Sequence, residues 1–305
     1  MGDDTSRGWR RALGLFAVAM ATSVVQPSVL VAVPLLVLLG LRGGRGAPVF
    51  FVTGMAVLVT VVGTQDAFWF TERAWALMLG GVFVALTMAV PRWGLASRAL
   101  ASVIGTAAVW GGILTLRTGA WAAIDWSVTD RLRTGFSTWM DAMVVLRQGE
   151  AVPPAMVSAI YQTVEAQAAV FPAMVALESV AALGVAWWLY VRLVQGSDRG
   201  LGPLSGFRFN DHLVWLMIVG LFLMAVRSGE ALTRVGANVS VFMGALYAVR
   251  GAGVFLFLTG GLSLLTYVMF ALGFVFAAPV VIGFAVFIGI ADTWLDLRAR
   301  AALTA

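Results

Sequence analysis

The feature that most constrains this chain is a series of long, almost uninterrupted apolar blocks. Residues 12–41 carry no charged side chain, and residues 235–290 carry only Arg250. An apolar run of about 18 residues or more is long enough to cross a bilayer as an α-helix. The alternation of apolar and polar residues that a membrane β-barrel requires is absent. The pattern therefore predicts an all-α, polytopic transmembrane helix bundle.

Composition supports a membrane protein and removes several other classes. Hydrophobic residues make up 61% of the 305 residues and charged residues 11%, against about 25% charged in an average soluble domain. A soluble enzyme, a disordered tail and a secreted disulfide scaffold are therefore excluded. The arginines that give the net charge of +5 are scattered singly at the ends of apolar blocks, so we expect no nucleic-acid partner.

Residues typical of metal sites and of catalytic motifs are scarce. The chain has no cysteine and one histidine, His212, so a thiolate or multi-histidine metal site cannot form. Nucleotide-binding glycine loops, HExxH and GxSxG are also missing. We therefore expect no metal, no cofactor and no enzymatic activity.

The blocks predict about seven to nine apolar segments in a single membrane domain, residues 1–305. Two regions leave the count open. Residues 12–41 form either one long kinked span or two segments that meet near Gln26 and Pro27, because proline disrupts a helix interior. Residues 235–290 hold either two long or three short helices at about 20 residues per span.

Residues 117–167 are the only sizeable polar stretch, with a charge balance of −1 that favours the outer face. Apolar residues recur there at helical spacing, and Pro153–Pro154 is typical of a helix start. We expect two amphipathic helices between the fourth and fifth spans, either on the membrane surface or capping the bundle. A solvated loop with chance periodicity is the alternative.

Two charges lie inside apolar spans, where they are costly and are functional hypotheses by default. Glu178 falls near the middle of the fifth span, and Arg250 falls in the long C-terminal block. One hypothesis places Glu178 in an internal cavity as a ligand or proton group. The other is a purely structural pair between Glu178 and Arg250. Arg250 could also extend to an interface if the chain breaks at the glycines beside it.

The densest polar and aromatic cluster is residues 206–212, directly before the sixth span. Asn210 or Asp211 is expected to cap that helix. The competing hypothesis is a binding or coupling surface that includes Arg208, Asp211 and His212. Asn238, early in the next span, is expected to form a hydrogen bond between helices.

These C-terminal motifs resemble a known family. Residues 207–215 read FRFNDHLVW, Asn238 opens the next span, and residues 289–298 read GIADTWLDLR. Together with Glu178, their order and spacing resemble the YybS-like family of predicted bacterial membrane proteins of unknown function, most clearly over residues 170–300. The resemblance implies a multi-pass protein of the bacterial inner membrane. In size and helical layout the chain is also similar to the substrate-binding components of energy-coupling-factor transporters, which is an analogy of fold alone.

The leading functional hypothesis is small-molecule binding or transport at a mid-membrane cavity. Its ligand-binding residues would be Glu178, Arg250 and Asn238. The alternative is a non-catalytic scaffold or assembly factor that binds a membrane or cytoplasmic protein partner. An intramembrane enzyme would need Glu178 to converge with Asp211 or Asp292. The coupling or partner surface would consist of Arg208, Asn210, Asp211, His212 and Asp292.

Overall fold

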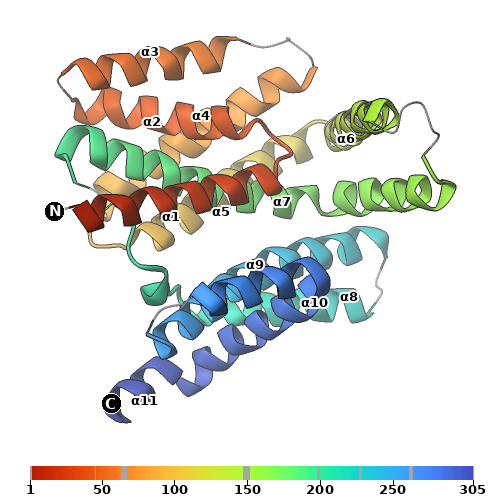
Figure 1. Cartoon of the computed structure of the whole chain (residues 1–305). Coiled ribbons are helices and arrows are strands. Elements are labelled where there is room, and N and C mark those ends of the chain that lie inside the picture. The colour runs from red at the N-terminus through yellow and green to blue at the C-terminus, as the bar shows by residue number, and fades with distance from the viewer. Residues whose placement is uncertain are drawn as a thin grey trace. The chain divides into compact units, whose positions relative to one another are not determined.

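A computed structural model describes residues 2–44, 46–62, 67–146, 152–197, 200–226, 229–260 and 264–304 (Figure 1). These residues form α-helices, two short 3-10 turns and no strand, so the all-α prediction is confirmed for them. The first seven helices are α1 (Gly2–Ala21), α2 (Pro27–Arg42), α3 (Ala47–Val61), α4 (Ala67–Ala89), α5 (Leu95–Leu116), α6 (Ala120–Leu146) and α7 (Pro154–Gln195). The others are α8 (Val214–Val226), α9 (Glu230–Leu258), α10 (Leu264–Leu295) and α11 (Leu297–Thr304), and the 3-10 turns are η1 (Leu204–Gly206) and η2 (Asp211–Leu213).

Five helices in the described part of the chain are long and apolar enough to cross a membrane. Three shorter apolar helices, two of them α2 and α3, accompany them. The predicted number of seven to nine membrane-spanning segments is therefore not confirmed. The spanning candidates are Phe68–Ala89, Leu95–Leu116, Pro154–Gln195, Glu230–Leu258 and Phe276–Leu295.

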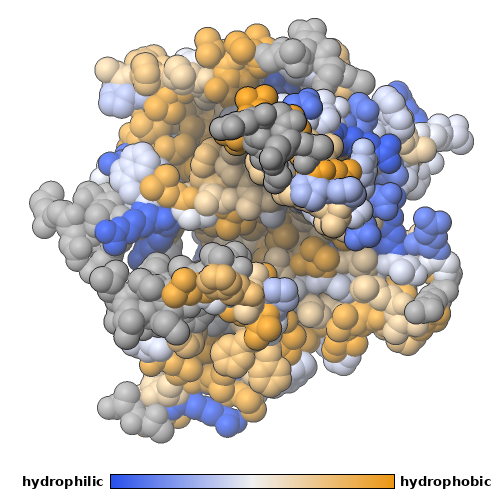
Figure 2. Space-filling model, turned by 45° about the vertical axis from the view of Figure 1, so that its right-hand side comes forward, coloured by the Kyte–Doolittle hydropathy of each residue, from blue (hydrophilic) through white to orange (hydrophobic). Residues whose placement is uncertain are grey.

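Large apolar side chains remain exposed on these helices. Phe50 and Phe51 of α3 are more than two-thirds exposed, as is Phe287 of α10. Hydrophobic residues cover much of the face seen in Figure 2. Such a surface is costly in water and suits the hydrocarbon of a bilayer, which supports a membrane location.

The chain divides into two compact units, Met1–Gly200 and Leu201–Ala305. Each has its own set of packed helices: α1 to α7 in unit 1, and α8 to α11 in unit 2. The single membrane domain expected over residues 1–305 stays a prediction, since two units can serve one membrane domain.

The apolar block at residues 12–41 forms two helices, which resolves the open alternative. Helix α1 ends at Ala21, and α2 begins at Pro27, whose fixed φ suits the first helical position. The short segment between them, residues 22–26, is hereafter the α1–α2 turn. Both helices pack on α7, and α2 also packs on α4, so this turn is held inside unit 1.

The polar stretch at residues 117–167 contains parts of two helices, as predicted. Helix α6 accounts for the first amphipathic segment. The second is the start of α7, which runs unbroken from Pro154 to a left-handed Gly196. No breaker interrupts α7 except Pro172, which the helix accommodates. The second predicted helix is therefore present, but it is continuous with the fifth span; residues 147–151 lie outside the described residues.

In unit 2, the described residues of 235–290 form three helical segments, because the backbone of α10 is not helical at Ala277 (φ −142°, ψ 37°). Helix α9 continues through Gly251 and Gly253, and α10 bends at Ala277 next to Pro279. A Cβ on Gly251 would collide with the backbone oxygen of Ala285, and one on Gly289 with that of Tyr247. Glycine is thus required at this crossing of α9 and α10, as the closely packed helices of membrane proteins often require.

Candidate functional site

Glu178 lies on α7, where its side chain is fully buried in unit 1. Its Oε2 accepts hydrogen bonds from the backbone N–H groups of Val24 (3.1 Å) and Val25 (3.3 Å). Its Oε1 has no hydrogen-bond partner among the described residues. The expected buried charge is therefore present, and it holds the backbone of the α1–α2 turn.

A second buried carboxylate, Glu72 on α4, holds the same turn. Its Oε1 accepts from the backbone N–H of Gln26 at 3.2 Å and from the guanidinium of Arg131 on α6. Its Oε2 pairs with Arg73 at 2.9 Å. Nearby, the indole of Trp75 donates to the hydroxyl of Ser179 at 3.0 Å. Two carboxylates from different helices therefore fix one short piece of backbone.

The need for these acceptors follows from the turn itself. The N–H groups of Val24, Val25 and Gln26 lie between α1 and α2, where no helix supplies an acceptor for them. In a membrane, non-helical backbone is tolerated only where it is buried in protein or lines a cavity. Glu72 and Glu178 supply the missing acceptors, so both have a structural role.

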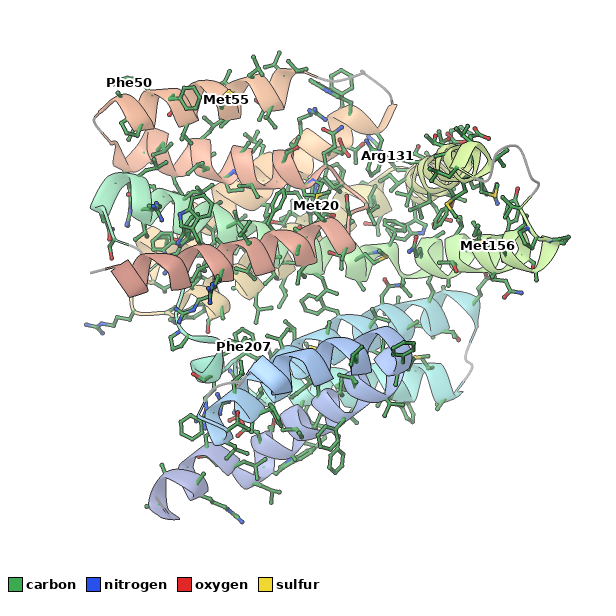
Figure 3. All side chains as sticks on the ribbon, in the orientation of Figure 1. Met20, Phe50, Met55, Arg131, Met156 and Phe207 are labelled. Atoms are coloured by element: carbon green, nitrogen blue, oxygen red, sulfur yellow. The ribbon has the colours of Figure 1, made fainter. Side chains whose placement is uncertain are left out.

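The other side of the turn faces a pocket of about 490 Å³. Residues 23–27 form one wall, α6 forms most of the opposite wall, and Ile160 of α7 contributes at the edge. Val24, Val128 and Phe136 make the lining largely apolar, whereas Arg131 brings a charge to it. Figure 3 labels Arg131 on α6. This volume falls in the range of about 300–1,000 Å³ typical of ligand sites.

Glu178 does not line this pocket. It holds the α1–α2 turn that forms the wall, so its predicted role as a ligand-binding residue stays a prediction. Glu72 was missed as a site residue because it lies at the edge of an apolar block, where charges are expected at the interface, and Arg131 was missed because it lies in the polar stretch, where a charge is ordinary. For Glu72, a helix predicted to begin at Ala67 would have placed this residue more than one turn inside a span, and α4 does begin there.

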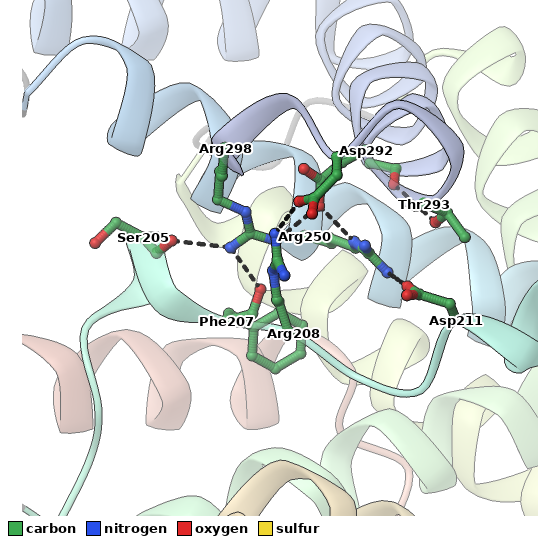
Figure 4. A network of polar contacts seen from close by, with 10 residues as sticks. Ser205, Phe207, Arg208, Asp211, Arg250, Asp292, Thr293 and Arg298 are labelled. Atoms are coloured by element: carbon green, nitrogen blue, oxygen red, sulfur yellow. Dashed lines mark hydrogen bonds and ion pairs between the residues drawn. The ribbon is translucent and has the colours of Figure 1, made fainter. Parts of the chain in front are cut away.

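The second polar site lies in unit 2 and is centred on Arg250 and Asp292, both almost fully buried (Figure 4). Arg250 donates from Nε to Oδ2 of Asp292 at 2.9 Å, and from a terminal nitrogen to Oδ1 of Asp211 at 2.6 Å. Arg298 donates to the same Oδ2 of Asp292 at 2.8 Å. One buried aspartate thus joins two guanidinium groups.

The network also anchors the polar segment before α8, residues 204–213. Arg298 donates to the backbone oxygens of Ser205 (2.9 Å) and Phe207 (3.1 Å). The guanidinium of Arg250 lies 5.5 Å from the ring centre of Phe209, which packs edge-on against Tyr247. This segment is therefore attached to α9 and to α11 at several points.

The structure gives the predicted residues of unit 2 different roles. Asn210 accepts from the backbone N–H of His212 at 3.0 Å, so the predicted cap is confirmed at η2. Asp211 and His212 are exposed, and Arg208 forms an exposed pair with Asp296.

Three further expectations concern the buried or partly buried residues of this unit. Asp292 lies beneath the surface that it was expected to join. Asn238 donates to the backbone oxygen of Arg234 within α9, so the expected bond between helices stays a prediction. Arg250 is buried and paired, and it does not extend to an interface.

The hydrogen bonds of Glu178 and Arg250 in the structure come from other partners, so the proposed pairing of the two residues stays a prediction. Glu178 takes its hydrogen bonds from unit 1, and Arg250 takes both of its carboxylate partners from unit 2. The partners that sequence reasoning missed here are Arg298 and, for Arg250, Asp211. Among the described residues, no group of three or more His, Asp or Glu side chains could hold a metal ion.

Comparison with family models assigns most of the chain to one family. The family of predicted membrane proteins DUF2232 matches residues 12–293. The chain belongs to this family. The match includes Glu178, Arg250 and Asp292, and it agrees with the resemblance to YybS-like membrane proteins. No curated protein and no solved structure matches the chain.

Proposed function

We propose that this membrane protein binds a small molecule in the pocket beside the α1–α2 turn. The observation that supports the proposal is a pocket of about 490 Å³ whose wall is a turn held by two buried carboxylates. A largely apolar cavity with a few fixed polar groups is the usual form of a small-molecule site. Transport of the bound molecule, and the absence of enzymatic activity, remain parts of this proposal.

Chemistry of the lining defines the class of ligand. The hydroxyl of Ser23, the amide of Gln26 and the guanidinium of Arg131 are the polar groups of the pocket. The apolar remainder suits a ligand with a hydrocarbon or aromatic body. Arg131 already contacts Glu72, so a ligand with a hydrogen-bond acceptor would share an existing ion pair.

The direction of access follows from the long helix α7. If Arg192 marks the cytoplasmic boundary, Glu178 lies about 21 Å along the helix from it, at 1.5 Å per residue. A hydrocarbon core of about 30 Å would then end near Pro172. The pocket edge at Ile160 would lie beyond that boundary, so the ligand would enter from the outer face rather than from the middle of the membrane.

Native mass spectrometry of protein extracted gently from its own membrane tests the proposal. Gly135 lines the pocket, and a Cβ there meets nothing within 4 Å, so Gly135→Leu should fill the pocket without a clash. We expect a small-molecule adduct on the wild type that is lost in Gly135→Leu. The matched control is Gly112→Leu on α5, which is equally open and lies outside the pocket.

Two results would reject the assignment. An adduct that persists in Gly135→Leu would place the ligand elsewhere. A stoichiometric protein partner with no small-molecule adduct would favour the scaffold function.

A further inference from the structure

We infer that a second site on unit 1, distinct from the pocket of the proposed function, binds an anionic phospholipid. The acyl chain would lie in an apolar groove formed by α1, α2, α3 and α7. The headgroup would lie at the arginine-rich ends of these helices.

The groove has a volume of about 370 Å³. Helix α1 lines it with Trp9, Ala12, Leu13 and Phe16, a spacing that places all four on one helix face. Helices α2 and α3 contribute residues at the same spacing, from 28 to 35 and from 52 to 59. Each wall therefore extends about 10 Å along its helix, at 1.5 Å per residue.

The lining of the groove suits a hydrocarbon chain. Ser28 is the only lining residue with a hydroxyl group. The other lining residues are aliphatic or aromatic, together with one methionine, Met55. Trp188 on α7 is 1% exposed and forms the floor, whereas Leu13 and Met55 are about half exposed at the rim. Figure 3 labels Met55 on α3. The groove is thus open to the surface on which lipid chains would lie.

One end of the groove is basic and aromatic. The guanidinium of Arg192 lies 5.2 Å from the ring of Trp9 and 5.4 Å from that of Trp188. These rings pack edge-on at 4.9 Å. Tryptophan and arginine at helix ends are typical of the headgroup layer of a membrane.

Helix α2 ends in the same place. Arg42 is its last residue, and a Cβ on the adjacent Gly44 would lie 3.2 Å from Val194 of α7. The ends of α2 and α7 are therefore side by side. Helix α1 starts there as well, which brings Arg10 and Arg11 to the same end.

The opposite end of the groove has the opposite charge. Ser28 lies beside the α1–α2 turn, which Glu72 and Glu178 hold. A phospholipid with its chain in the groove therefore has only one favourable orientation, with its phosphate at the arginines. An excess of arginine marks the cytoplasmic side, and the cytoplasmic leaflet is the one rich in anionic lipid.

The test is lipid titration of the delipidated full-length chain in mild detergent, followed by native mass spectrometry. The probes are phosphatidylglycerol and phosphatidylcholine with identical acyl chains. We expect tighter binding of phosphatidylglycerol by the wild type. Arg42→Gln should weaken phosphatidylglycerol binding about fivefold and leave phosphatidylcholine binding unchanged, because one surface arginine contributes about that factor.

Filling the groove should have a different effect. Ala12 is buried in the groove and Ala17 is exposed on the same helix. Ala12→Leu should weaken binding of both lipids, whereas Ala17→Leu should weaken neither. Arg117→Gln, on an exposed residue after α5, is the charge control, and a thermal unfolding curve for each variant verifies the fold.

Three results would overturn the inference. The first is equal binding of the two lipids by the wild type. The second is an unchanged lipid preference in Arg42→Gln. The third is binding by Ala12→Leu that matches Ala17→Leu.

Discussion

Each of the two polar sites contains a buried carboxylate, but the hydrogen-bond donors to that carboxylate differ. Glu178 and Asp292 are both buried carboxylates on long apolar helices. Glu178 accepts from two neutral backbone amides, whereas Asp292 accepts from two guanidinium groups. The site of Glu178 depends on an acceptor atom, and the site of Asp292 depends on a negative charge. Replacing each carboxylate by its neutral amide should therefore destabilise the second site more than the first.

The largest effect is expected for Asp292→Asn. The variant retains the shape of the side chain but leaves Arg298 without its carboxylate and Arg250 with only the exposed Asp211. Breaking a buried ion pair by removing one partner costs about 3–5 kcal/mol. Reversible unfolding in mixed micelles should show a loss of that size. A loss below about 1 kcal/mol would mean that hydrogen bonds, and not charge, hold this network.

Glu178 offers the contrasting pair of variants. Glu178→Leu removes both acceptor atoms and leaves the N–H groups of Val24 and Val25 unpaired, which costs about 1–3 kcal/mol each. Glu178→Gln retains an acceptor oxygen and should cost less than about 1.5 kcal/mol. The same unfolding assay compares the two. If Gln destabilises unit 1 as much as Leu, the negative charge matters at both sites and the contrast fails.

The sequence pattern predicts which residues of these sites are buried, but not which residues they contact. A lone charge in an apolar block predicts burial, and Glu178 and Arg250 are indeed buried. The pattern does not give rotation about the helix axis, so it could not reveal that Arg250 faces Asp292 and Asp211. It also considers only side chains as hydrogen-bond partners, whereas the donors to Glu178 are backbone N–H groups.

The helices show the same limit. Apolar blocks predicted the all-α class, because each block must satisfy its own backbone in lipid. Block length alone did not show that the start of α7 and the fifth span form one continuous helix. It also gave no indication that Glu72 lies inside a helix, where the structure places it in α4.

A third prediction concerns the crossing that positions Arg250 and Asp292. Gly251→Ala should destabilise unit 2 by about 1–3 kcal/mol, the usual cost of overpacking, because the backbone oxygen of Ala285 cannot move aside easily. The matched control is Gly244→Ala on the same helix, where a Cβ meets nothing within 4 Å. That control should be neutral or stabilising by up to about 1 kcal/mol. If the two variants had the same unfolding free energy, the close crossing of α9 and α10 would not be what supports the network.

The smallest effect is expected at the exposed pair of Arg208 and Asp296, which contrasts with the buried network of unit 2. Both side chains are about half exposed, so solvent screens their attraction and a pair of this kind contributes about 0–1 kcal/mol. Arg208→Gln should therefore leave the unfolding free energy almost unchanged, in contrast to Asp292→Asn. The two variants should also differ in salt dependence, because screening acts on exposed charges and much less on buried ones. A large loss of stability in Arg208→Gln would show that this pair belongs to the buried network and that the boundary drawn here between exposed and buried charges is wrong.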